Sequence, residues 1–148
     1  MKTFFLMSVL APMAPAQSVP DPTEVPLRVE IAIAQGEETH TYTLDVTANR
    51  SRLSELRQGR EIAIQGESAP QYRNVGTNIQ CKASTRGDRF LVWLALERSS
   101  IAESAGGHPS FHTFHVMSEL LLASDEDVSL VTSSEDSWTV NVMLRVRD

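Results

Sequence analysis

Hydrophobic and polar residues alternate along most of the chain after its first 26 positions. Between Leu27 and Ala34 every second residue is a large aliphatic one, and the residues between them are charged or small. A period of two is typical of a β-strand that is buried on one face. The same alternation recurs from Tyr42 to Val46 and again from Trp138 to Arg147. The last segment predicts one buried face, which we expect to pack with Phe90, Val92 and Leu94; that face carries Trp138, Val140, Val142 and Leu144.

Two glycines mark tight turns between neighbouring strands. Gly36 separates the strands predicted over 27–34 and 42–46, and Gly87 separates two longer strands predicted over 72–84 and 89–98. Glycine favours such positions because it tolerates a positive φ angle. Both pairs of strands are therefore expected to form hairpins.

The run from Phe90 to Leu96 is apolar on both faces. We expect such a run in a central strand that is covered on both sides. One short helical turn is expected near residues 51–58, before Gly59. The fold class predicted is all-β: a single β-sandwich-like domain of about eight mostly antiparallel strands over residues 27–148.

The first 26 residues have a different character. Lys2, the apolar run from Phe4 to Ala11 and the Ala14–Ala16 motif predict a signal peptide over residues 1–16, cleaved near Ala16. Residues 17–26 contain three prolines and are predicted to be a Pro-rich tether. The expected location is thus periplasmic or secreted. No integral membrane span is expected after signal removal, because the apolar run is shorter than the roughly 20 residues that a helix needs to cross a bilayer.

The composition excludes several classes of protein. The 148 residues include 13 Lys+Arg and 19 Asp+Glu, which gives a net charge of −6 and argues against a nucleic-acid partner. A single cysteine, Cys81, excludes an internal disulfide framework and a multi-cysteine zinc site. Cys81 is expected to be a buried structural thiol.

No catalytic, cofactor-binding or metal site is predicted from the residues. His112 and His115 lie three positions apart in a predicted strand, so they point to opposite faces and cannot share a metal ion without a bulge in the strand. His108 is separated from them by a proline, and the acids from Asp125 to Asp127 are typical of a charged turn. The roles of the three histidines and of Cys81 are left open.

Four arginines gather within 11 residues and form a candidate partner surface. They are Arg50, Arg52, Arg57 and Arg60. Guanidinium groups pair readily with carboxylates and phosphates, so this surface could hold an acidic partner or a lipid headgroup; a solvated connection is the alternative.

Four segments together resemble the C-terminal β-core of bacterial secretins, the ring-forming outer-membrane channels of secretion and pilus systems. The segments are 57–64 (RQGREIAI), 72–81 (YRNVGTNIQC), 86–100 and 109–147, so the match runs over about Leu56–Arg147. The family's turn with the sequence Gly-Gln-Thr is replaced here by the three acids from Asp125 to Asp127. The resemblance implies the β-fold of that core and an envelope role; it does not imply a channel, because no segment matches the family's membrane hairpins or gate.

These observations predict a non-enzymatic exported envelope β-domain, secretin-core-like, that binds or assembles with envelope or secretion-type proteins. It is expected to be a monomer or small oligomer without cofactors. The alternative is a stand-alone secreted β-sandwich that binds a small ligand or glycan. A groove that carries Trp93 or Tyr72 exposed would favour this alternative.

Overall fold

The computed structural model describes residues 23–64, 69–103, 109–132 and 138–148. The predicted signal peptide and residues 17–22 of the predicted tether lie outside these ranges, and the first strand already begins at Val25. The strands are β1 (Val25–Gln35), β2 (Glu38–Ala48), β3 (Ser54–Ile64), β4 (Gln71–Arg86), β5 (Arg89–Glu103), β6 (Pro109–Leu122), β7 (Asp127–Thr132) and β8 (Trp138–Val146).

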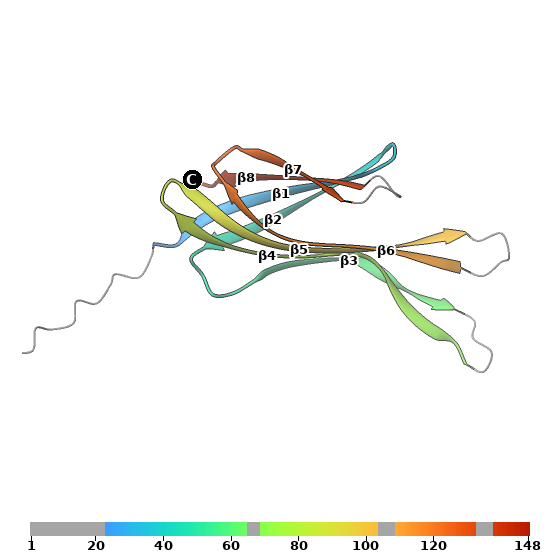
Figure 1. Cartoon of the computed structure of the whole chain (residues 1–148). Helices are drawn as coiled ribbons and strands as arrows, with labels where there is room; N and C mark the ends of the chain where they lie inside the picture. The colour runs from blue at the N-terminus through green and yellow to red at the C-terminus, as the bar shows by residue number, and fades with distance from the viewer. Residues whose placement is uncertain (1–22, 65–68, 104–108, 133–137) are drawn as a thin grey trace, which may run out of the picture.

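The eight strands form two antiparallel sheets that pack face to face (Figure 1). The first sheet has the order β2-β1-β8-β7, and the second has the order β3-β4-β5-β6. This arrangement confirms the predicted all-β fold. The described residues include no helix of the length and hydrophobicity needed to cross a membrane.

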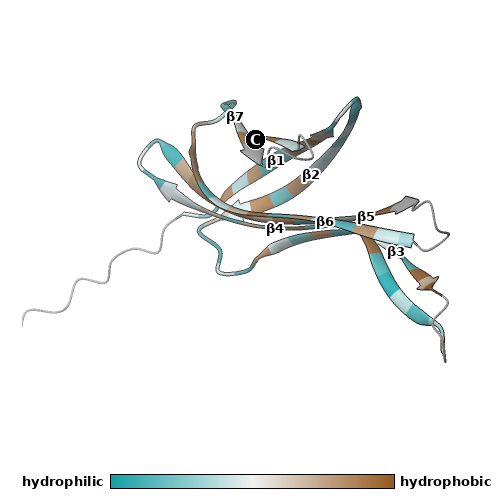
Figure 2. Cartoon of the chain, turned by 45° about the vertical axis from the view of Figure 1, so that its right-hand side comes forward, coloured by the Kyte–Doolittle hydropathy of each residue, from teal (hydrophilic) through white to brown (hydrophobic). Residues whose placement is uncertain are grey.

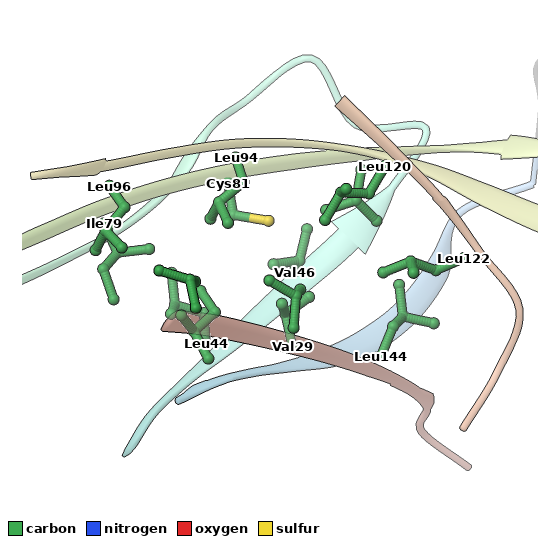
Figure 3. Packing of buried hydrophobic residues seen from close by; sticks show 14 of the residues in the cluster. Val29, Leu44, Val46, Ile79, Cys81, Leu94, Leu96, Leu120, Leu122 and Leu144 are labelled. Carbon is green, nitrogen blue, oxygen red and sulfur yellow. The ribbon is translucent and has the colours of Figure 1, made fainter. Parts of the chain in front are cut away.

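Alternation along the strands builds the core between the sheets. Brown and teal segments follow one another along β1 and β2 in Figure 2, as a period of two requires. Figure 3 shows side chains from both sheets meeting in the layer between them, among them Val29 and Leu144 of the first sheet and Cys81 and Leu94 of the second. The predicted buried face of the last strand is confirmed, because Trp138 is 4% exposed and Val140, Val142 and Leu144 are 0% exposed.

Both predicted glycine turns are present. Gly36 has a φ angle of 58° between β1 and β2, and Gly87 has a φ angle of 65° between β4 and β5. At the second turn Arg86 pairs with Arg89, so the connection has two residues. The positive φ angles give the physical reason for glycine at these two positions.

The helical turn expected near residues 51–58 is wrong. Residues from Ser54 onward belong to β3, which pairs with β4 from Ser54 opposite Cys81 to Ile64 opposite Gln71. A single helical turn closes few hydrogen bonds for the conformational freedom that it loses, whereas the long edge of β4 offers a backbone partner to each residue of β3. Leu56 also packs against the core from this strand.

The expectation that the run from Phe90 to Leu96 is covered on both sides is also wrong. The strand is central in its sheet, and Phe90, Val92, Leu94 and Leu96 are buried in the core. The opposite face, with Trp93 at its centre, is only half-buried because the described residues contain no third layer. Met117 and Leu121 of β6 lie on this same open face, 61% and 49% exposed.

Asn49 fixes the point where the chain crosses from the first sheet to the second. Its φ angle is 66°, and its backbone N–H donates to the carbonyl oxygen of Ala83 at 2.9 Å. Its side-chain oxygen accepts from the backbone N–H of Thr85 at 2.9 Å. Asparagine is among the few residues that tolerate this conformation, and its amide replaces the hydrogen bonds that the strands no longer supply.

Candidate functional site

The second sheet divides beyond the sandwich into two separate hairpin arms. Pairing between β4 and β5 begins at the turn and ends where Gly76 meets Ser99. Beyond that point residues 71–75 of β4 pair only with β3, and residues 100–103 of β5 pair only with β6. Figure 1 shows the β3–β4 arm bending away from the β5–β6 arm. We call this divided end the fork.

A pair of glycines holds the two strands of the bent arm together at the base of the fork. Gly59 of β3 lies directly opposite Gly76 of β4, and Gly76 has a φ angle of 145°. A Cβ atom on Gly76 would overlap the carbonyl oxygen of Gln58, and one on Gly59 would overlap the carbonyl oxygen of Val75. Only glycine at both positions allows the backbones to approach this closely.

Two recesses lie at the base of the fork. A recess of about 470 Å³ is lined by residues of both arms, including Arg60 and Val75 from one arm and Ser100 and Ile101 from the other. A second recess of about 460 Å³ is lined by residues that include Glu61, Asn74, Glu97 and Ser99. Neither recess is lined by Trp93 or Tyr72, the residues that would favour a glycan or small ligand.

A polar contact network closes the end of the core next to the fork. Thr77 is the buried polar residue there, 6% exposed, and its hydroxyl lies 2.8 Å from the Tyr42 hydroxyl. Arg98 donates to the Tyr42 hydroxyl at 3.0 Å, and its guanidinium lies 5.8 Å from the centre of the Trp138 ring. Trp138 in turn stacks on Phe114 with ring centres 4.8 Å apart. The first and second sheets are thus joined at the fork by aromatic and hydrogen-bonded groups.

One side chain reaches from one arm to the other. The guanidinium of Arg73 on β4 lies 5.1 Å from the centre of the Phe111 ring on β6. Such a cation–π contact is weak at an exposed site, about 0.5–1 kcal/mol. The two arms are therefore held mainly by their own hairpin pairing.

The four arginines of the candidate partner surface do not share one face. Arg50 forms an ion pair with Glu24 at 2.8 Å, which raises the pKa of the guanidinium. Arg52 lies exposed in the connection before β3. Arg57 and Arg60 both line a recess at the fork, but they lie three positions apart in one strand and so point to opposite faces.

Arg57 is held by its neighbours on the face opposite the core. Its guanidinium lies 2.8 Å from the carboxylate of Glu55, which also accepts from the side-chain amide of Gln80 at 3.0 Å. These two contacts, the one from Gln80 first, lower the pKa of Glu55. Arg60 has no carboxylate within ion-pair distance in the described part of the chain.

The remaining candidate groups are spread over the fold. His112 and His115 are both exposed on β6 and point to opposite faces, while His108 lies outside the described residues. Asp125 and Glu126 form a charged turn, paired with Arg145 at 3.4 Å and Arg89 at 3.5 Å. Within the described ranges no three His, Cys, Asp or Glu side chains are placed to hold a metal ion.

Cys81 lies in the core and is expected to be unreactive in the folded chain. It is 0% exposed, and burial raises the pKa of its thiol to about 12, from 9.0. Since the thiolate is the reactive form, iodoacetamide at pH 8 should label Cys81 only after the chain is unfolded in urea. Mass spectrometry before and after unfolding measures this, and fast labelling without urea would contradict the buried position.

The same shift sets a pH limit to stability. The unfolded thiol ionises near its ordinary pKa of 9.0, while the folded thiol stays neutral up to about pH 12. Between about pH 9 and pH 12 only the unfolded state is stabilised by ionisation of this thiol. The free energy of unfolding should therefore fall as pH rises through this range.

Sequence reasoning placed Gly59 at the end of a helical turn and Gly76 within a strand, and it did not connect the two. The available signal is that both glycines interrupt otherwise regular strand patterns, which indicates a bulge or a close backbone approach. Their direct pairing depends on the register of β3 against β4, which the expected helical turn obscured.

The comparisons with known proteins bear on the fold. No family model and no curated protein matches the sequence. Among solved structures, the secretin in the ETEC pilotin–secretin AspS–GspD complex is similar, with a TM-score of 0.57 and 10% identity over 75% of this chain. The type II secretion system secretin GspD of E. coli K12 is similar with a TM-score of 0.50 and 12% identity over 84% of this chain.

The match is to part of each secretin. This chain covers 29% of the first of these secretin chains and 48% of the second. At such low identity a similarity of backbones shows the fold alone. The chain has a secretin-like fold.

Proposed function

We propose that this chain is a non-enzymatic, exported envelope domain that assembles with proteins of a secretion-type complex by strand addition. The observation that carries the proposal is the second sheet of this secretin-like fold, which projects beyond the sandwich with open strand edges. An unpaired strand edge presents a row of backbone donors and acceptors to an incoming strand.

The similar structures support an envelope partner. One of them is a complex of a secretin with a pilotin, and the other is a component of a type II secretion system. For this chain we propose a periplasmic or secreted location after cleavage near Ala16, with residues 17–26 as a tether. We propose that the domain itself is a monomer or small oligomer, and that larger assemblies form with partners.

The edge of β6 offers a direct test of this assembly in the native host. A photo-crosslinking amino acid at Met117, which is 61% exposed on this edge strand, should yield adducts with envelope proteins of a secretion-type complex. Mass spectrometry identifies the adducts, and the mass of the chain itself should correspond to an N-terminus near Gln17.

The matched control is the same amino acid at Ala32. This residue lies on the outward face of β1, whose backbone is paired on both sides by β2 and β8. It should give no specific adducts, because a strand with two neighbours cannot accept a third. Identical adducts from both positions, or adducts with cytoplasmic proteins alone, would refute assembly through this edge.

A further inference from the structure

The face of the fork that continues the core side of the second sheet carries positive charge without matching carboxylates. Strand alternation places Arg60, Arg73 and Arg98 on the core-side face of their strands β3, β4 and β5. None of the three arginines has a carboxylate within ion-pair distance in the described ranges. The nearby acids Glu61 and Glu97 alternate onto the opposite face.

This local excess of positive charge is unusual for the chain. The whole sequence has a net charge of −6. Six arginines elsewhere in the described residues pair with Asp or Glu; they are Arg28, Arg50, Arg57, Arg89, Arg145 and Arg147. The fork face is therefore a place where an external acidic group would find cations that are not already neutralised.

Open backbone edges lie beside these cations. Residues 71–75 of β4 and 100–103 of β5 each pair with a strand on one side only, and their free edges border the fork. The recess of about 470 Å³ at the base is lined by Arg60 together with residues of both strands. An extended peptide could thus form backbone hydrogen bonds with an arm while its side chains reach the arginines.

We propose that the fork binds an acidic, extended peptide segment of a partner, added as a strand to the free edge of β4 or β5. Alternate acidic side chains of the segment pair with Arg60 and Arg73, and its backbone pairs with the arm. A peptide fits this site better than another polyanion, because the free edges supply hydrogen-bond partners for a peptide backbone. The inference rests on the proposed function and names the kind of partner segment that one end of the domain accepts.

A synthetic peptide tests the site on the purified chain that begins near Gln17. The probe is a fluorescent heptapeptide in which glutamate and valine alternate, and binding is followed by fluorescence anisotropy. We expect saturable binding that weakens as salt is raised, since exposed ion pairs are screened. A peptide with lysine in place of glutamate should not bind. A peptide with proline in place of valine should bind about tenfold more weakly, because proline removes the backbone N–H of every second residue and restricts the extended backbone.

Charge-removing variants locate the site. The double variant Arg60→Gln, Arg73→Gln should bind the probe about tenfold more weakly than the original chain, because two charge-assisted contacts are lost. Arg86→Gln removes an exposed cation at the β4–β5 turn, at the other end of β4 from the fork, and should leave binding within about twofold of the original. Circular dichroism and the melting temperature show whether each variant is folded.

Three results would overturn the inference. The first is equal binding of the glutamate–valine and the proline-containing peptides, which would mean that no strand is added. The second is equal binding by the double variant and Arg86→Gln. The third is an equal affinity for heparin or RNA, which would indicate charge attraction alone. Crosslinking from Met117 is independent of the fork, so envelope adducts there combined with failure of the peptide would reject this site and leave the proposed function standing.

Discussion

Substitution of Val142 by Asp is expected to abolish folding of the domain. Val142 is 0% exposed in the middle of β8, between Ile31 of β1 and Val128 of β7. A carboxylate there would have no partner in the core, and burying it costs several kcal/mol. Since domains of this kind are stable by only about 5–15 kcal/mol, most of the chain should be unfolded or aggregated.

The matched control is Thr139→Asp on the same strand. Thr139 is half-buried on the outward face of the first sheet, so its carboxylate would stay hydrated. The loss of stability should be within about 1 kcal/mol. Thermal unfolding followed by circular dichroism compares the two variants, and equal losses of melting temperature would mean that burial on β8 is not one-sided.

Substitution of Gly76 by Ala should destabilise the bent arm by about 3 kcal/mol. The new methyl group would overlap the carbonyl oxygen of Gln58, and the φ angle of 145° is itself unfavourable for alanine. The pairing of β3 with β4 must then open at the base of the fork. Hydrogen exchange should show faster exchange in residues 60–64 and 71–75, while β1 and β8 retain their protection.

Gly87→Ala measures the cost of an unfavourable φ angle without the steric overlap. Gly87 also has a positive φ angle, but no atom lies within 4 Å of the position that its Cβ would take. The cost should be about 1 kcal/mol, from the backbone conformation alone. If both variants lose the same stability, the close approach of Gly59 and Gly76 contributes nothing.

The strands could be predicted from the sequence, because hydrophobicity that alternates with a period of two is enough to identify the buried face of a strand. Leu27, Val29, Ile31 and Ile33 are all 0% exposed, as their alternation predicts. The turns at Gly36 and Gly87 could also be predicted, because a β-turn involves only four consecutive residues and its positive φ angle favours glycine.

The candidate site was not readable, because it depends on the pairing of distant segments. The fork exists where β5 stops pairing with β4 at Ser99 opposite Gly76, and no local pattern marks that point. Likewise, the sequence predicted that the apolar face around Trp93 is covered. A run that is apolar on both faces does not reveal how many layers pack against it, so this prediction was wrong. The arginines near Arg57 clustered in sequence but separated in space, since adjacent positions in a strand face opposite ways.

The pairing of the first strand with the last also determines when the domain can fold. Leu27 of β1 lies opposite Val146 of β8, so the first sheet joins the two ends of the described chain. Contacts of such long sequence separation form slowly, because a long loop must close before any of them stabilises the structure. A ribosome or a translocon that has released only the first strands would hold a β1–β2 hairpin without the strand that completes its sheet. For a chain that is exported as we propose, this delay keeps the polypeptide unfolded, and therefore able to pass through a translocon, until β8 has crossed. Folding is then completed on the far side of the membrane.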